Sequence, residues 1–116
     1  MSLSDEQELF LLDVIKLIPF AIAQGFKVTG GELFRTPEQQ QLYVSSGKSH
    51  TLASKHLERL AIDLNFIKNG VAVYDKKMLQ QIGDFWETLS PNNSWGGNWI
   101  SFCDTPHFQR DRKSVV

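Results

Sequence analysis

The spacing of apolar and polar residues divides the chain into helical and extended segments in mixed order. Residues 9–23 are rich in Leu, Ile and Phe, and we expect a buried helix there, within residues 1–24. Residues 76–89 carry apolar side chains every three or four positions, which is typical of an amphipathic helix. The predicted inner side of that helix comprises Met78, Leu79, Ile82, Phe85, Trp86 and Leu89. Segments 26–29 and 60–67 alternate apolar and polar residues, as strands with one buried face do.

Capping residues indicate where two of the helices begin. Ser4 followed by Gln7 resembles a capping box, which predicts the start of the first helix. Thr36 is a typical N-cap residue, and Pro37 favours the first position of a helix. We expect this second helix to run to about Ser45.

A hairpin and a third helix follow in the second half of the chain. Asn69-Gly70 is the strongest short hairpin signal, and it joins segment 60–67 to a partner strand at 71–74. Asp75 then caps the helix that follows. The predicted fold class is α+β, with helices packed on a small antiparallel sheet. We expect a single domain over residues 1–116, with residues 110–116 as a flexible basic tail.

The segment from Trp95 to Trp99 combines large aromatic residues with Gly96-Gly97. Large aromatic side chains usually fill a core. Adjacent glycines are instead typical of a loop that lies close to a ligand or to another backbone. Both roles, filling the core and forming a pocket wall, stay open for the two tryptophans.

The composition is that of an ordinary globular domain, and it narrows the classes of function. The chain has 116 residues, of which 41% are hydrophobic and 22% charged, enough for one hydrophobic core. A net charge of -1 gives no electrostatic case for binding nucleic acid. We expect a monomer without stable membrane insertion.

The apolar N-terminal segment does not resemble an export signal. Asp13, Lys16 and Pro19 interrupt it, and acidic residues precede it, so neither a signal peptide nor a membrane span is predicted. The single cysteine, Cys103, excludes an internal disulfide and suits a reducing cytosol. We interpret Cys103 as a small buried residue, with zinc ligation as the less favoured alternative. The protein is therefore expected to be made in the cytoplasm.

Two short segments carry two imidazoles and two carboxylates, in a chain with only three histidines. His56 precedes Asp63 by seven residues, and Asp104 precedes His107 by three. A catalytic zinc site takes such ligands in threes and keeps a water in its fourth position. One carboxylate would then remain as a base for that water. The third histidine, His50, lies in a polar loop and is a weaker candidate.

Each of these residues also fits a structural role when it is taken alone. The alternation around Asp63 places it opposite the apolar face of its strand, where a solvent-exposed aspartate is also expected. His56 could equally be a surface or capping histidine. Asp104 and His107 do not share a face by strand period, so the bend at Thr105-Pro106 must bring them together.

The wider context of these residues resembles the M15 zinc peptidases. The matching motifs are Ser54-x-His56 with Ala61-x-Asp63, and Asp104-x-Pro106-His107-Phe108. Further similar segments are residues 31–39, Leu42-Tyr43 with Gly47, and Trp95-Gly96-Gly97. The family includes D-alanyl-D-alanine carboxypeptidases and the phage L-alanyl-D-glutamate endopeptidases that act as endolysins. The resemblance implies a Hedgehog/DD-peptidase-like fold.

The resemblance also implies a role for each candidate residue. The implied zinc ligands are His56, Asp63 and His107. Asp104 would be the general base and acid, and Arg35 would bind substrate or stabilise the oxyanion. Ser54 and Gln39 are weaker candidates for substrate contact.

The sequence departs from the family pattern at two positions. Arg59 stands where the family usually has Gly, which affects the backbone beside the first ligand. Gln109 stands where the family often has Glu, although an amide can still hydrogen-bond to a ligand. Arg35 has a structural alternative too, namely a surface ion pair with Glu32 or Glu38.

These observations predict a zinc-dependent peptidoglycan peptidase. We expect a phage or prophage endolysin that hydrolyses the L-Ala–D-Glu amide of the stem peptide and reaches the cell wall after release from the cytoplasm. A D-Ala-D-Ala carboxypeptidase is the nearest alternative. A non-catalytic, zinc-stabilised domain that binds the wall or a protein is the second. In that second case Cys103 or His50 would close the metal site as a fourth ligand.

Overall fold

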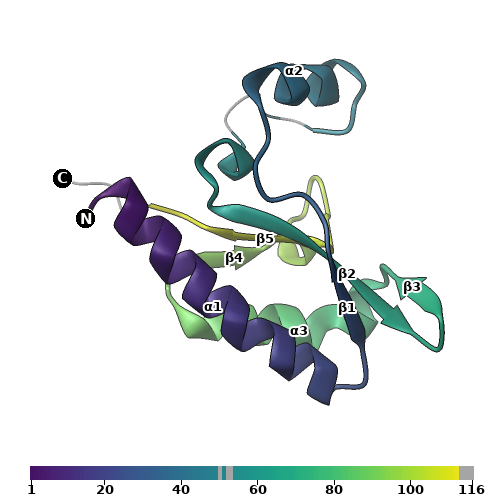
Figure 1. The fold of residues 1–116 in the computed structure, drawn as a ribbon. Coiled ribbons are helices and arrows are strands. Elements are labelled where there is room, and N and C mark those ends of the chain that lie inside the picture. The colour runs from purple at the N-terminus through teal and green to yellow at the C-terminus, as the bar shows by residue number, and fades with distance from the viewer. Residues whose placement is uncertain (50, 52–53, 113–116) are drawn as a thin grey trace.

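The computed structural model describes residues 1–49, 51 and 54–112, and this part of the chain has the expected α+β architecture (Figure 1). Its helices are α1 (Leu3–Ala23), α2 (Pro37–Ser45) and α3 (Lys76–Leu89). Its strands are β1 (Lys27–Gly30), β2 (Ala61–Lys68), β3 (Val71–Val73), β4 (Asn93–Trp95) and β5 (His107–Arg110). Two short 3-10 helices are η1 (Lys55–Glu58) and η2 (Gly96–Asn98).

The three α-helices begin at side chains that accept hydrogen bonds from free backbone amides. Thr36 and Asp75 cap α2 and α3, as the sequence predicts. The first helix begins earlier than predicted, because the capping box is formed by Ser2 and Asp5. Ser4, the residue predicted to cap α1, therefore already lies inside the helix.

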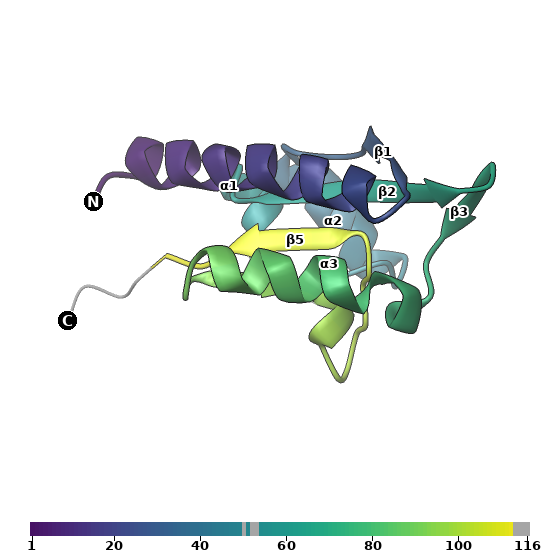
Figure 2. The same cartoon turned by 90° about the horizontal axis from the view of Figure 1, so that it is seen from below.

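The molecule is layered, with α1 and α3 side by side on one face of the sheet and α2 on the opposite side (Figures 1 and 2). The core between α1, α3 and the sheet is aromatic and aliphatic. Its largest fully buried apolar side chains are Trp86, Trp95, Phe10, Phe66, Phe108, Leu17, Leu60, Leu64, Leu79 and Ile82. Burial of each contributes about 1.5–3 kcal/mol relative to exposure.

Strand β2 is the centre of the sheet and pairs antiparallel with β1, β3 and β5. Its register sets Asp63 opposite His107 and Ile62 opposite Phe108. Since side chains alternate along a strand, Asp63 and His107 share one face while Ile62 and Phe108 share the other. Phe108 lies in the core, with its ring centroid 5.8 Å from those of Phe66 and Trp86. The burial of Phe108 in the core therefore holds β5, and with it the neighbouring His107, in place.

The C-terminal part of the sheet differs from the prediction. Strands β4 and β5 were not predicted, and Arg110 ends β5 instead of beginning a flexible tail. Arg110 is buried, and its guanidinium donates hydrogen bonds to Glu6 on α1 and to Ser90. A buried Arg whose charge is paired is indistinguishable from a surface Arg in a hydropathy pattern. Residues 113–116 lie outside the described part of the chain.

Two further burial predictions were wrong. Met78, predicted on the inner side of α3, is 50% exposed. Cys103, predicted to be buried, is exposed, and its thiol contacts the carbonyl oxygen of Gly97. Met78 lies in the first turn of α3, and Cys103 lies in the loop between η2 and β5.

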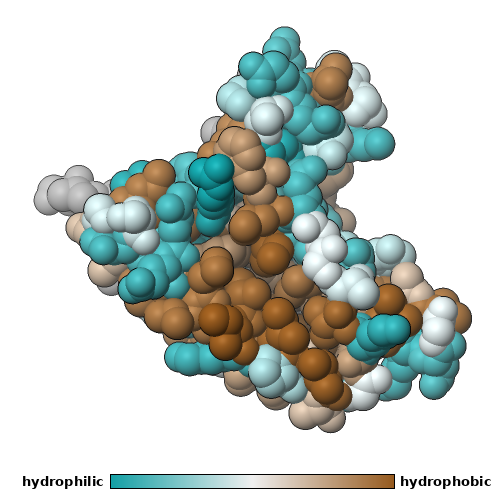
Figure 3. Space-filling model, viewed as in Figure 1, coloured by the Kyte–Doolittle hydropathy of each residue, from teal (hydrophilic) through white to brown (hydrophobic). Residues whose placement is uncertain are grey.

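The outer face of α1 is unusually apolar, as the space-filling view shows over this helix (Figure 3). Its exposed large side chains are Leu9, Leu11, Leu12, Ile15 and Ile22. Even so, the described residues include no helix with the length and apolar character that crossing a membrane requires.

Gly83 provides a test of the packing between α3 and the sheet. A Cβ at this position would overlap the indole ring of Trp95. We expect Gly83→Ala to lower the free energy of unfolding by about 1–3 kcal/mol, although Ala normally favours a helix over Gly by about 1 kcal/mol. Urea unfolding followed by circular dichroism measures the change.

The matched control for this substitution is Gln81→Ala on the exposed side of α3. It should alter the stability by less than about 0.5 kcal/mol. A Gly83→Ala protein as stable as the wild type would contradict the close packing of Trp95 on this helix.

Candidate metal and catalytic site

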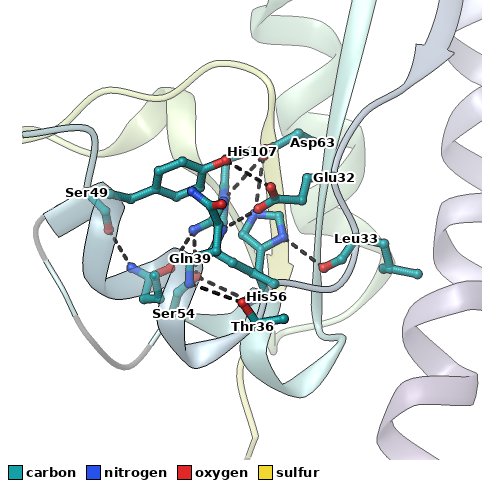
Figure 4. Close-up of polar contacts among 12 residues, drawn as sticks. Glu32, Leu33, Thr36, Gln39, Ser49, Ser54, His56, Asp63 and His107 are labelled. Carbon is teal, nitrogen blue, oxygen red and sulfur yellow. Dashed lines mark hydrogen bonds and ion pairs between the residues drawn. The ribbon is translucent and has the colours of Figure 1, made fainter. Parts of the chain in front are cut away.

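Three side chains that lie far apart in the sequence meet on the open face of the sheet (Figure 4). His56, Asp63 and His107 each direct one potential ligand atom to a common point, and these atoms all lie within 4.8 Å of one another. Asp63 Oδ1 is 3.4 Å from His56 Nε2 and 3.6 Å from His107 Nδ1. Such convergence of two imidazoles and a carboxylate is what a divalent metal ion requires.

The short helix η1 places His56. The Ser54 hydroxyl caps η1 by accepting a hydrogen bond from the His56 amide, and the His56 side chain is fully buried. The helix ends at Arg59, whose φ of 55° lies in the left-handed region. Glycine adopts this conformation without steric cost, which explains why Gly suits the position. Here Arg59 adopts it, with its guanidinium 4.2 Å from the ring centroid of Phe34.

Backbone pairing on both sides fixes Asp63. Its carbonyl oxygen accepts a hydrogen bond from the Gly31 amide at 2.7 Å, and its own amide donates to the Glu32 carbonyl at 2.9 Å. Strand β5 pairs with it on the other side. A Cβ on Gly31 would crowd the Asp63 backbone, so a glycine is needed for this approach.

A tight turn carries the chain from Asp104 into β5. The His107 amide donates to the Asp104 carbonyl at 3.1 Å, across Thr105 and Pro106. The bend therefore forms as predicted, and it brings Asp104 Oδ2 to 4.0 Å from His107 Nδ1. Gly96 supports the turn from below, since its carbonyl accepts from the Asp104 amide at 2.9 Å.

Hydrogen bonds at the far ring nitrogens define the tautomers of both histidines. His56 Nδ1 donates to the Leu33 carbonyl at 2.9 Å, which leaves Nε2 facing Asp63 with its lone pair free. His107 Nε2 donates to Gln109 Oε1 at 2.7 Å, which leaves Nδ1 facing Asp63 in the same way. Both rings are therefore oriented as neutral metal ligands are.

Two atoms at the centre of the cluster have no hydrogen-bond partner among the described residues. They are His56 Nε2 and Asp63 Oδ1, and both are buried. Unpaired buried polar atoms are costly, so two of them aimed at one point are the geometry of a binding site for a cation. Burial alone would raise the pKa of Asp63, but the imidazoles of His107 and His56 outweigh it and hold that pKa well below its usual range. The residues therefore fit a cation.

Asp104 lies at the edge of the cluster and is partly exposed. Burial raises the pKa of Asp104 above its ordinary value, with His107 opposing the shift and Asp63 adding to it. Unlike Asp63, Asp104 is not a member of the converging set. Its carboxylate is thus free to exchange a proton with a molecule in the adjacent cavity.

Arg35 is held by a polar network on the other side of the site. Its guanidinium pairs with Glu32, donates to Gln40 Oε1 at 2.7 Å, and lies 3.4 Å from Ser54 Oγ. The ring of Tyr43 stacks on it at 4.6 Å, and the Tyr43 hydroxyl donates to Glu32. The ion pair with Glu32 that the sequence offered as an alternative therefore exists, within the site itself.

A cavity of about 350 Å³ opens beside these groups. Its described lining residues are Arg35, Lys48, Ser49, Thr51, Ser54, Lys55, Trp99, Ser101, Phe102, Asp104, His107 and Gln109. Trp99 forms part of the wall, with its ring centroid 4.8 Å from that of His107. Trp95 is fully buried. Of the two roles that the sequence left open, Trp95 therefore fills the core and Trp99 forms a pocket wall.

Not every candidate residue lies at the cluster. Gln39 makes a backbone hydrogen bond to Thr36, and its neighbour Gln40 is the fully buried residue that contacts Arg35. Sequence reasoning missed Gln40, because the two glutamines differ only in which side of α2 they occupy. Cys103 is not part of the converging set, and His50 lies outside the described residues.

Comparisons with known proteins place the chain among peptidases. A family model described as D-alanyl-D-alanine carboxypeptidase, of the M15 peptidases, matches residues 47–110. The L-alanyl-D-glutamate peptidase of Listeria phage A118 is 33% identical over 99 residues, which cover 84% of this chain and 35% of that protein. The crystal structure of the L-Ala D-Glu endopeptidase of Serratia marcescens is similar with a TM-score of 0.66 and 28% identity, covering 84% of this chain and 77% of that one.

The chain belongs to the M15 peptidase family, since the family model covers more than half of it. It spans about a third of the length of the phage relative. The family resemblance of the motifs and the expected fold are thereby confirmed.

The tautomer of His56 is a direct test of the site geometry. At a pH where the ring is neutral, the metal-free protein should show His56 protonated at Nδ1 and not at Nε2, because Nδ1 donates to Leu33. Long-range ¹H–¹⁵N correlation spectra report the tautomer. A His56 ring protonated mainly at Nε2 would contradict the orientation described above.

Proposed function

We propose that this protein is a zinc-dependent peptidoglycan peptidase that hydrolyses the L-Ala–D-Glu amide of the stem peptide. The observation that carries this proposal is the convergence of His56, Asp63 and His107 beside a cavity that Asp104 and Arg35 also line. The names of the phage and Serratia relatives support this choice of bond.

In this proposal His56, Asp63 and His107 hold the zinc ion. Two neutral imidazoles and one carboxylate are a common catalytic donor set, and they leave a position open to solvent. When bound, zinc supplies a Lewis acid that lowers the pKa of a coordinated water to about 7. Asp63 would supply the one anionic ligand of this set.

Asp104 acts as the proton carrier. It accepts a proton from the attacking water and delivers it to the nitrogen of the leaving amine. Its raised pKa favours the first step, because a more basic carboxylate accepts a proton from water more readily. The turn at Thr105-Pro106 keeps it beside His107.

Arg35 stabilises the negative charge that develops on the carbonyl oxygen of the scissile amide. Its guanidinium is held in place by Glu32, Gln40 and Tyr43 before substrate arrives, so little reorganisation is needed. Ser54 fixes both Arg35 and the amide of His56, which makes it a positioning residue more than a substrate contact.

The lining of the cavity suits an acidic peptide. Arg35, Lys48 and Lys55 contribute three cations to the described lining and Asp104 one carboxylate, with Glu32 and Glu58 pairing to Arg35 and Lys55 from beside it. A stem peptide that contains D-Glu retains a free carboxylate beside the scissile bond, which these cations would attract. Action on the cell wall after release from the cytoplasm, by a monomer, completes the proposal.

Two alternatives lead to different outcomes. A D-Ala-D-Ala carboxypeptidase with the same residues would release free D-Ala and leave the L-Ala–D-Glu bond intact. A non-catalytic domain with a structural zinc would need a fourth protein ligand. Among the described residues Cys103 does not supply one.

Metal binding is the first prediction of the proposed function. The wild-type protein should bind one zinc ion, and His56→Ala, Asp63→Ala and His107→Ala should each weaken binding by more than about 100-fold. Metal content after dialysis and a competition titration against a chelating dye measure this. The control Asp75→Ala removes a carboxylate from the α3 cap and should keep the wild-type affinity. Equal zinc content in all four variants would contradict the assignment.

The second prediction separates catalysis from metal binding. Asp104→Asn should retain zinc, because Asp104 is not part of the converging set, while its hydrolysis rate falls by about 100- to 10,000-fold. Mass spectrometry of digested muropeptides identifies the bond that is cut. Release of D-Ala with an intact L-Ala–D-Glu amide would favour the carboxypeptidase. Undiminished activity of the variant would show that Asp104 is not the base.

A further inference from the structure

Strand β5 carries a line of polar side chains that extends away from the site. His107, Gln109 and Asp111 are two residues apart, so their side chains lie on one face of the strand and its extension. His107 Nε2 donates to Gln109 Oε1 at 2.7 Å, and Gln109 Nε2 donates to an Asp111 carboxylate oxygen at 2.8 Å.

Asp111 itself is held by the backbone. Its amide donates to the carbonyl of Asn92 at 2.7 Å, which continues the pairing of β4 with β5 by one residue. The backbone of Asp111 is therefore fixed, and its carboxylate projects from a defined position even though the residue is exposed.

The donors and acceptors of Asp111, Gln109 and His107 allow only one set of hydrogen-bond directions along this line. An ionised carboxylate only accepts hydrogen bonds, so Asp111 requires the NH₂ group of Gln109 to face it. The oxygen of the Gln109 amide then faces His107 and also only accepts. The imidazole must in turn carry its proton on Nε2, which leaves the lone pair of Nδ1 directed at Asp63.

We propose that Asp111, acting through Gln109, is a positioning residue that selects the Nε2–H tautomer of His107 and so presents Nδ1 to the cluster. A carboxylate at position 109 would accept from His107 with either oxygen and would need no orienting partner. An amide at this position can rotate by 180° and offer its NH₂ group to His107 instead, which would favour a proton on Nδ1. Asp111 prevents that rotation.

The effect on metal affinity rests on the proposed role of His107 as a ligand, whereas the effect on the tautomer does not. The experiment therefore measures both. The first measurement is the tautomer of His107 in the metal-free protein, from long-range ¹H–¹⁵N correlation spectra at a pH where the ring is neutral. The second is the affinity for zinc, from competition with a chelating dye.

In the wild-type protein we expect His107 protonated at Nε2. In Asp111→Ala we expect a substantial population protonated at Nδ1 and a loss of zinc affinity of about 10- to 100-fold. The double variant Gln109→Glu with Asp111→Ala should restore both the Nε2–H tautomer and the affinity, since the carboxylate needs no orientation. This rescue distinguishes orientation of the amide from a general loss of stability.

The matched control is Asp84→Ala. Asp84 accepts a hydrogen bond from Gln80 at 2.8 Å on the exposed surface of α3, so the substitution removes the same charge and the same kind of contact elsewhere. It should leave the tautomer of His107 and the zinc affinity unchanged. An equal loss of affinity in this control would overturn the proposal in favour of a charge effect.

The remaining outcomes are also decisive. An unchanged His107 tautomer in Asp111→Ala overturns the proposal, whatever happens to metal affinity. Failure of the double variant to restore the tautomer overturns it as well. A shifted tautomer in a protein that binds no zinc would support the role of Asp111 and refute the metal function proposed for the cluster.

Discussion

The pairing of β2 with β5 is the constraint on which the site depends. This register sets Asp63 directly opposite His107, on the face away from the core, while Ile62 and Phe108 pair on the core face. A slip by one residue would move each of these side chains to the other face. The packing of Phe108 against Trp86 and Phe66 resists such a slip, so the hydrophobic core secures the register of the polar cluster.

The polar face is built at a cost in stability that the rest of the fold offsets. Within the described part of the chain, His56 Nε2 and Asp63 Oδ1 are buried without hydrogen-bond partners, and each such atom costs about 1–3 kcal/mol. Hydrogen bonds with neighbouring backbone groups hold the residues that carry those two atoms in place. Leu33 fixes the ring of His56, and Gly31 fixes the backbone of Asp63. The proposed metal ligands are held in place by partners that lie outside the converging set.

Positions in which the chain comes close to itself explain several residues that otherwise have no evident role. Gly31 lets the chain approach Asp63, and Gly96 lets it approach the turn at Asp104. Arg59 adopts a left-handed conformation beside His56 that glycine would adopt without strain. These three positions surround the cluster and set the backbone from which its side chains project. The backbone conformation at these positions therefore determines where the side chains of the cluster lie.

The sequence by itself determined the periodic helices, the hairpin at Asn69-Gly70 and the family to which the chain belongs. Helix α3 lies at the predicted residues because its apolar spacing and its cap at Asp75 are local signals. The sequence also indicated the bend between Asp104 and His107, since Pro106 restricts the backbone locally.

Only the tertiary structure decided which polar residues support the cluster. Gln40 and Asp111 carry no local signal, because the role of each depends on a partner that folding brings beside it or on the strand that holds it. Strand β5 was missed for the same reason, since its four residues become a strand by pairing with β2 and β4. Hydropathy and capping are properties of neighbouring residues, whereas hydrogen-bond partners are chosen by the three-dimensional register.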